Sequence, residues 1–283
     1  MTDKYAVIGN PIAHSKSPQI HRMFAEQTGQ DISYEAIEAP LDGFADTIAR
    51  LRREGYKGCN VTVPFKFEAS RIVSDMSREV TDAIDSGNNA DAVNTLDFRN
   101  GKKIGHNTDG IGLVRDIMHN LHFEIFGKRV LLMGAGGAAY GVLHPLLEKQ
   151  PSELVIANRT LEKAMQFKKF IERTEQFSIT SVSVNSYPDL SGKHFYLVIN
   201  ATSTGLTDEM PPLPRGIFAP GALAYDMMYG RETPFMKFAR EQGAAIVADG
   251  LGMLVEQAAE SFFIWRGVRP DTRPVLEALR RPP

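Results

Sequence analysis

The sequence predicts an α/β protein of two domains, each built on a mainly parallel sheet that helices cover. Short apolar runs alternate along the chain with longer amphipathic runs, which is the order of strands and helices in such folds. The chain has 283 residues, whereas a single domain commonly has roughly 150. Its 43% hydrophobic and 23% charged residues are typical of a globular protein.

The first part of the chain alternates strand and helix signals. The predicted strands cover residues 4–10, 32–39, 56–65, 92–98 and 102–107, and the predicted helices cover 17–29, 41–55 and 66–86. Ser17 is expected to cap the first helix, with Pro18 in its first turn and Gly29 at its end. Asn100 and Gly101 mark a turn between the last two strands.

A second unit begins near Asp109, where we place the domain boundary. A helix is predicted over residues 108–121, and residues 128–160 follow the order strand, glycine turn, helix and strand. Further predictions are strands over 195–202 and 222–229, a surface loop over 207–223, and helices over 253–265 and 275–279. We expect one domain of residues 109–248 and another of residues 1–108 and 249–283, to which the last helices return.

Composition excludes several classes of protein. Lys plus Arg number 32 and Asp plus Glu number 34, for a net charge of −2, so the basic excess of a nucleic-acid binder is missing. The one cysteine, Cys59, allows neither an intrachain disulfide nor a four-cysteine zinc site. The sequence contains neither a secretory signal pattern nor an apolar run of about 18 residues. We therefore expect a cytoplasmic protein with no nucleic-acid or membrane partner. No metal is expected either, because no carboxylate pattern accompanies His119 and His122.

A glycine-rich turn follows the apolar run 130–133 and opens a predicted helix. It consists of Gly134, Ala135, Gly136, Gly137, Ala138 and Ala139. The spacing fits G-x-G-x-x-(G/A), in which the glycines permit a tight turn and a close approach of the backbone to a pyrophosphate. The helix N-terminus adds partial positive charge for the anion. The turn therefore predicts a Rossmann-type dinucleotide-binding domain.

The end of the next strand predicts which dinucleotide binds. Units that bind NAD place an acidic residue there for the ribose 2′-hydroxyl, whereas this chain has Asn158, Arg159 and Thr160, with Lys163 one turn later. A guanidinium and a hydroxyl suit a 2′-phosphate. We therefore predict NADP as the cofactor. The alternative is that Arg159 is a solvated surface arginine.

Three polar segments of the first domain are candidates for the substrate site. Ser15 and Ser17 stand before a helix and could bind a carboxylate, although Ser17 as a helix cap and Ser15 as a loop residue is the slightly favoured explanation. Thr62 shares a strand face with Asn60, and Lys66 follows a proline turn at that strand's end. Asp109 lies at the domain junction, and a Lys and an Asp from two strand ends could act together on a carbonyl or hydroxyl oxygen.

In combination, these segments resemble the family of NADP-dependent shikimate dehydrogenases. The matching motifs are GNPIAHSKSPQIH, NVTVPFK, AVNT, NTDG, GAGGAA, NRT, NATSTGL, DMMY and GLGMLVEQAAESFFIWRG. They occur in the family's order over nearly the whole chain. The resemblance implies reversible hydride transfer between NADPH and the C3 carbonyl of 3-dehydroshikimate, in the pathway to chorismate and the aromatic amino acids. It also implies that the C-terminal helices return to the substrate domain.

The resemblance assigns roles residue by residue. Lys66 and Asp109 would be the catalytic pair and also contact the substrate. The other substrate contacts would be Ser15, Ser17, Thr62, Asn94, Tyr229 and Gln257. The NADP contacts would be Gly134, Ala135, Gly136, Gly137, Ala138, Asn158, Arg159, Thr160, Lys163, Thr202, Gly250 and Met253. Tyr140 and Lys163 depart from the family's usual residues, which predicts weaker phosphate contacts without changing the preferred cofactor.

Two alternative functions stay open at this stage. A quinate/shikimate dehydrogenase, or a paralogue that acts on a related ring acid, would share the carboxylate site. A regulatory nucleotide-binding protein without catalysis would be expected to have lost Lys66 or Asp109, and both are present. The sequence leaves the oligomeric state open between monomer and homodimer.

Overall fold

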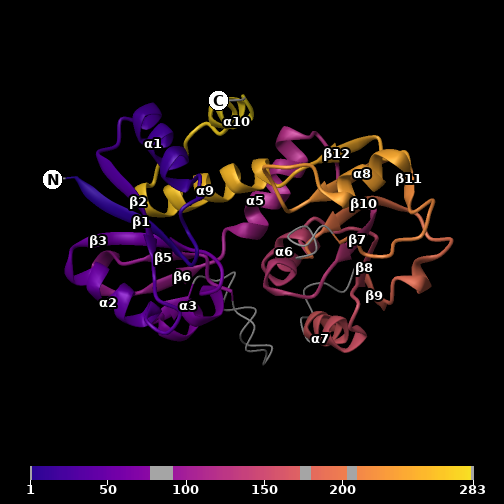
Figure 1. Ribbon diagram of the computed structural model, residues 1–283, viewed down its shortest axis with the longest axis horizontal. Coiled ribbons are helices and arrows are strands. Elements are labelled where there is room, and N and C mark those ends of the chain that lie inside the picture. The colour runs from indigo at the N-terminus through magenta and orange to yellow at the C-terminus, as the bar shows by residue number, and fades with distance from the viewer. Residues whose placement is uncertain (1, 77–91, 173–179, 203–208, 282–283) are drawn as a thin grey trace. The chain divides into compact units, whose positions relative to one another are not determined.

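The computed structural model describes residues 2–76, 92–172, 180–202 and 209–281, which form two compact units (Figure 1). The first unit comprises residues 1–112 and 254–283, and the second comprises residues 113–253. From Leu254 onward, the C-terminal helices therefore fall in the first unit. The functional role of each unit remains a prediction at this point.

The first unit is built on a six-stranded sheet in the order β2-β1-β3-β5-β6-β4. Its strands are β1 (Asp3–Gly9), β2 (Ile32–Glu38), β3 (Tyr56–Val61), β4 (Asp75–Met76), β5 (Thr95–Asp97) and β6 (Ile104–His106). Strands β1, β2 and β3 are parallel, as are β4 and β6, whereas β5 runs antiparallel to both its neighbours. The predicted hairpin around Gly101 is confirmed as the β5–β6 connection.

Helices cover this sheet with two apolar cores. The helices are α1 (Ser17–Thr28), α2 (Phe44–Arg53), α3 (Lys66–Ile72), α9 (Leu251–Arg266), α10 (Arg273–Arg280) and the start of α5 (Asp109–Arg115). In one core, Phe44, Ile48 and Leu51 of α2 are buried, as their helical spacing predicted. In the other, α1 packs against α9 through Phe24 and Phe262. Each large apolar side chain buried in this way contributes about 1.5–3 kcal/mol.

Two predicted boundaries in this unit are corrected. Helix α1 begins at Ser17 itself, with Lys16 in the cap position. Ser17 therefore does not cap the helix with its side chain. Instead, the Ser15 hydroxyl accepts a hydrogen bond from the backbone N–H of Ser17, at 3.3 Å. The helix predicted over 66–86 ends at Ile72, because Val73 is extended and leads into β4; residues 77–86 lie outside the described residues. Gly29 ends α1 with a φ of 64°, as predicted.

The second unit is a Rossmann-type sheet of six parallel strands in the order β12-β11-β10-β7-β8-β9. The strands are β7 (Arg129–Met133), β8 (Glu153–Ala157), β9 (Ser181–Asn185), β10 (Phe195–Asn200), β11 (Phe218–Asp226) and β12 (Ile246–Ala248). Strand order reverses between β7 and β10, and ligands of such sheets bind at the carboxyl ends of the strands at this point. The surface loop predicted over 207–223 is wrong from Phe218 onward, where β11 begins.

Helices α6 (Gly137–Leu147), α7 (Leu161–Glu172) and α8 (Pro234–Glu241) connect the strands of this unit. A π-helical turn (Asp116–Asn120) continues from α5. Strands β7, β8 and β10 are almost fully buried, which is why their sequences are continuous apolar runs rather than alternating ones. The predicted strand–turn–helix–strand order of residues 128–160 is confirmed.

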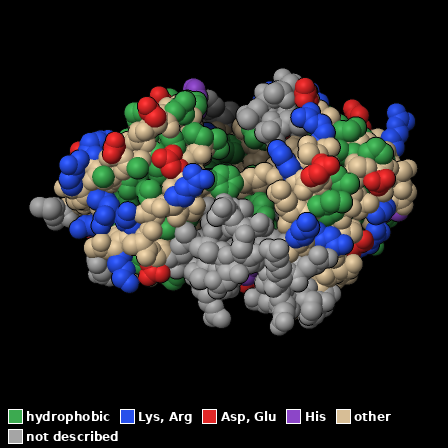
Figure 2. Space-filling model, turned by 90° about the horizontal axis from the view of Figure 1, so that it is seen from below, with side chains coloured by type: hydrophobic (Ala, Val, Ile, Leu, Met, Phe, Trp, Pro, Cys, Tyr) green, Lys and Arg blue, Asp and Glu red, His purple; other side chains and the backbone are tan. Residues whose placement is uncertain are grey.

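The charges of the chain are mixed on the surface. Figure 2 shows Lys and Arg side chains interspersed with Asp and Glu on one face, consistent with a net charge of −2. Of the helices in the described ranges, none is long and apolar enough to cross a membrane.

Candidate active site

Lys66 and Asp109 form an ion pair in the first unit. Lys66 is the first residue of α3, and Asp109 is the first residue of α5. The Lys66 Nζ donates to the Asp109 Oδ2 at 2.5 Å. The lysine side chain keeps 24% of its surface exposed, and the aspartate keeps 10%. The pair is therefore largely desolvated, yet it can be reached by a small molecule.

Asn94 holds the aspartate of this pair. Its Nδ2 donates to the Asp109 Oδ1 at 2.8 Å, while its Oδ1 accepts the backbone N–H of Thr108, also at 2.8 Å. Asn94 is 2% exposed. The Gln257 Oε1, on α9, lies 3.3 Å from both the Asn94 Nδ2 and the Thr108 hydroxyl. Both oxygens of Asp109 are thus engaged, and the carboxylate is fixed in orientation.

A second group of buried polar residues, which the sequence analysis did not assign, supports Asn94. The Asn60 Nδ2 donates to the Asn94 carbonyl, the Thr95 hydroxyl and the Ser261 hydroxyl at 3.2, 3.0 and 2.9 Å. The Ser261 and Thr95 hydroxyls are 2.8 Å apart. Asn60 was recognised only as sharing a face with Thr62, and Ser261 lies in a helix whose sequence indicates core packing. The sequence signal that could have identified Ser261 is its position as a polar residue within an apolar helix face.

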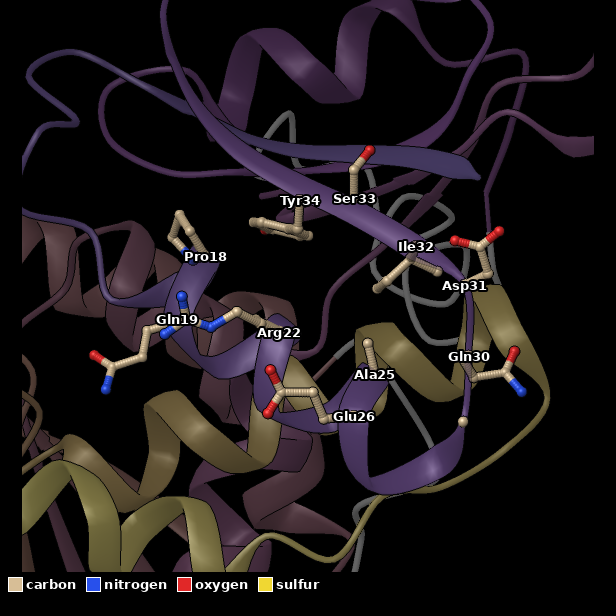
Figure 3. A pocket seen from close by; sticks show the side chains of 11 residues that line it. Pro18, Gln19, Arg22, Ala25, Glu26, Gln30, Asp31, Ile32, Ser33 and Tyr34 are labelled. Atoms are coloured by element: carbon tan, nitrogen blue, oxygen red, sulfur yellow. The ribbon is translucent and has the colours of Figure 1, made fainter. Parts of the chain in front are cut away.

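The network extends from Asn60 toward Ser17. The Tyr34 hydroxyl donates to the Asn60 Oδ1 at 2.7 Å, and the Ser17 hydroxyl lies beside the same phenol. Burial raises the pKa of Tyr34 well above its ordinary value, so the phenol remains a donor. Tyr34 also lines a groove of about 670 Å³ between α1 and β2, with Arg22 and Glu26 on its helical wall (Figure 3).

His21 packs beside this network as a neutral base. It is fully buried, and its ring stacks on that of Tyr34 with centroids 4.0 Å apart. Burial lowers the pKa of His21 to about 3. When the pH falls below 6.5, the ordinary pKa of histidine, this side chain therefore binds a proton in the unfolded chain but not in the folded chain. The stabilisation is complete above about pH 6.5 and is lost as the pH falls toward 3.

We expect His21→Phe to flatten this pH dependence. Between about pH 7.5 and 5.5, the original chain should lose about 1.4 kcal/mol more unfolding free energy than the variant, because one fewer proton is linked to unfolding. Urea unfolding followed by the fluorescence of Trp265, the single tryptophan, measures the first unit. His14→Gln, at an exposed histidine, is the control and should leave the slope unchanged. Equal slopes for His21→Phe and the original chain would contradict the assignment.

The remaining predicted substrate residues fall in both units. Ser15 is partly exposed and Ser17 is buried, at the N-terminal end of α1. Thr62 directly follows β3, and its N–H donates to the carbonyl of Ile8 at 2.9 Å. Tyr229 lies in the second unit, beyond the end of β11, and is half-buried. Their contacts with substrate remain predictions.

The glycine turn has the conformation that a pyrophosphate site needs. Gly134 has a φ of 105°, which side chains rarely adopt, and a Cβ there would lie 3.0 Å from the carbonyl oxygen of Ala201. Gly136 faces open space and precedes α6, and Ala139 is fully buried against the sheet. Thr202 follows β10 and lies beside Gly134. Backbone and helix end are therefore accessible at the point where strand order reverses.

The end of β8 presents the residues predicted for the 2′-phosphate. Arg159, Thr160 and Lys163 are all exposed. The Asn158 Nδ2 donates to the carbonyl of Thr160 at 2.8 Å, which closes the turn before α7. The strand end itself, residues 157–160, contains no acid, although the exposed Glu162 precedes Lys163. With two cations and a hydroxyl exposed, this turn fits an adenosine 2′-phosphate. In the part of the chain that the structure describes, no group of His, Cys, Asp and Glu is placed to hold a metal ion.

Comparisons with known proteins find related sequences over nearly the whole chain. Family models match residues 7–96 (shikimate dehydrogenase substrate binding domain), 116–204 (shikimate / quinate 5-dehydrogenase) and 250–280 (shikimate 5′-dehydrogenase C-terminal domain). The NADP(+) shikimate dehydrogenase of Methylobacillus flagellatus is 57% identical over 278 residues, covering 98% of this chain and 99% of that protein. The corresponding enzyme of Nitrosospira multiformis is 57% identical over 281 residues, covering 99% and 98%.

Solved structures of similar sequence share the fold of this chain over nearly its whole length. An Ael1 enzyme from Pseudomonas putida is 46% identical, with a TM-score of 0.90 and 99% of each chain covered. Shikimate 5-dehydrogenase from Thermus thermophilus, solved in complex with NADP(H) and shikimate, is 30% identical, with a TM-score of 0.84 and 99% of each chain covered. The chain belongs to the shikimate dehydrogenase family.

Proposed function

We propose that this protein catalyses the reversible, NADP-dependent reduction of 3-dehydroshikimate to shikimate by hydride transfer at C3. The observation that carries the proposal is the Lys66–Asp109 ion pair, fixed by Asn94, in a chain of this family. NADPH supplies the hydride when bound. Gly134, Gly136 and the exposed Arg159 support the assignment of its pyrophosphate and 2′-phosphate to the second unit.

The first unit supplies acid–base and electrostatic catalysis. Negative charge grows on the substrate carbonyl oxygen during reduction, and the Lys66 ammonium stabilises that charge and donates a proton from Nζ. Asp109 orients the ammonium, and Asn94 keeps the carboxylate from rotating. In the reverse direction, the neutral amine takes the proton from the substrate hydroxyl. Ser15 and Ser17 bind the ring carboxylate at the start of α1, which a helix N-terminus favours.

The direct test is the appearance of NADPH absorbance when shikimate and NADP⁺ are added to the purified chain. Saturable oxidation of shikimate supports the proposal, whereas NADP⁺ binding without oxidation would leave only a nucleotide-binding protein. The same assay with quinate tests the alternative substrate, which carries an extra hydroxyl beside the carboxylate.

We expect Arg159→Ala to raise the KM for NADP⁺ about tenfold or more, with little change in the KM for NAD⁺. Hydrogen bonds to charged groups contribute about 1.5–3 kcal/mol, and only NADP⁺ offers a 2′-phosphate. Steady-state kinetics with each cofactor measures the effect. Arg215→Ala, at another exposed arginine of the same unit, is the control. An equal change for both cofactors would assign Arg159 to the surface instead.

We further propose that the protein acts in the cytoplasm as a monomer or homodimer. The lone cysteine supports the location, because disulfide-rich chains belong to oxidising compartments and this chain can form no internal disulfide. Fractionation of the native host tests the compartment, and sedimentation equilibrium tests the oligomeric state.

A further inference from the structure

Tyr225 and Asp116 form a buried pair in the second unit, apart from the residues assigned above. Tyr225 lies near the end of β11 and is fully buried, and Asp116, in the π-helical turn after α5, is 2% exposed. The Tyr225 hydroxyl donates to the Asp116 Oδ2 at 2.6 Å. The Asn120 Nδ2 donates to the other carboxylate oxygen at 2.9 Å. Burial raises the pKa of Tyr225 well above its ordinary value, so the phenol remains a donor at any working pH.

The pair contacts the first turn of α9. The Met253 backbone N–H donates to the Tyr225 hydroxyl at 3.3 Å. A Cβ at Gly252 would lie 1.9 Å from the Asp116 Oδ1, so the carboxylate sits directly against the helix backbone. A negative charge is stabilising at this end of a helix. Of the first N–H groups of α9, that of Met253 therefore bonds to Tyr225, whereas that of Leu251 donates to the Asp249 Oδ1 at 3.4 Å.

The start of this segment is held from the opposite side. The Gly250 N–H donates to the carbonyl of Met228 at 2.8 Å, and a Cβ at Gly250 would lie 2.2 Å from the carbonyl oxygen of Met227. Only glycine fits at this position. Residues 250–253 are thus fixed by the loop after β11 on one side and by the Tyr225–Asp116 pair on the other.

We propose that Tyr225 and Asp116 are positioning residues for the nicotinamide end of NADP, acting through the backbone of residues 250–253. The inference rests on the proposed function and on the family resemblance, which implies that the NADP contacts Gly250 and Met253 line the nicotinamide pocket. The adenosine end is assigned to residues 158–163, on a different strand end. Loss of the Tyr225 hydroxyl should therefore weaken binding of the nicotinamide half and leave the adenosine half unaffected.

The test compares two ligands on the whole chain by isothermal titration calorimetry. For Tyr225→Phe, the Kd of NADP⁺ should rise about three- to tenfold, the effect of one hydrogen bond. The Kd of adenosine 2′,5′-bisphosphate, which lacks the nicotinamide, should stay unchanged. Asp116→Asn, which removes the charge but keeps a polar side chain, should show the same split between ligands.

Tyr56→Phe is the matched control. It also removes a phenol that donates to a carboxylate, that of Glu35, in the first unit, and it should alter the affinity for neither ligand. Equal losses for both ligands in Tyr225→Phe, or no loss for either, would overturn the proposal. Failure of both Tyr225→Phe and Asp116→Asn to fold would overturn it as well, because the pair would then be required for the stability of the whole second unit. An unmutated chain that binds NADP⁺ without oxidising shikimate would refute the proposed function but leave this comparison of ligands valid.

Discussion

Lys66→Ala is expected to lower kcat for shikimate oxidation by about 10²–10⁴-fold, the usual effect of losing a catalytic acid–base group. The Kd of NADP⁺ should change little, because the assigned cofactor residues lie in the second unit. Removing the ammonium takes away the acid paired with Asp109 and the positive charge that offsets the charge on the substrate oxygen. Stopped-flow or steady-state absorbance of NADPH measures kcat, and calorimetry measures cofactor binding.

Lys102→Ala is the matched control for this variant. Lys102 also pairs with an aspartate, Asp75, at 3.4 Å in the same unit, but both side chains are more than half exposed. Exposed pairs contribute about 1 kcal/mol or less to stability, so this variant should retain full activity. Unchanged kcat in Lys66→Ala would refute the role assigned to the lysine, even if shikimate oxidation itself is confirmed.

Gly134→Ala is expected to lower the unfolding free energy of the second unit by about 2–6 kcal/mol and to abolish tight NADP⁺ binding. A φ of 105° strains any residue with a side chain, at about 1–3 kcal/mol. The added Cβ would also crowd the Ala201 carbonyl at 3.0 Å, and overpacking costs about 1–3 kcal/mol more. Relief of this crowding would move β7 and β10 apart at the proposed nucleotide site. Urea unfolding followed by circular dichroism and calorimetry with NADP⁺ measure the two effects.

Gly192→Ala separates backbone strain from crowding. Gly192 has a φ of 76° in the same unit, but a Cβ there meets nothing within 4 Å. This variant should lose about 1–2 kcal/mol of stability and bind NADP⁺ normally. If both alanine variants lose stability equally and both bind NADP⁺, glycine at position 134 would be required only for the backbone conformation of the turn and not for nucleotide binding.

The parts of the site that sequence predicted are those encoded within a short segment. The glycine turn, with the strand before it and the helix after it, is one such segment, and so is the polar end of β8. Lys66 and Asp109 each stand at the start of a helix next to a strand end, so their meeting could be expected from α/β topology. The apolar face of α2 is similarly local, because Phe44, Ile48 and Leu51 recur at helical spacing.

The network behind the catalytic pair could not be predicted in the same way. Asn60 bonds to Tyr34 and Ser261, which are 26 and 201 positions away in the chain. Each of these side chains alone is an ordinary polar residue, and only the folded first unit reveals that they share hydrogen bonds. Two short strands were not predicted, for a related reason. Strand β4 has two residues and β12 has three, too few for an alternation of apolar and polar residues to be recognised.

The first unit is made of two separate parts of the chain, so its last part is synthesised after the whole of the second unit. When residue 253 leaves the ribosome, every strand of the second sheet has been made, whereas most of α9 and all of α10 have not. Phe24 on α1 then lacks its partner Phe262, and Asn60 lacks Ser261. The first unit to be translated is therefore completed after the second sheet, and Lys66 and Asp109 acquire their full surroundings only once α9 has been made.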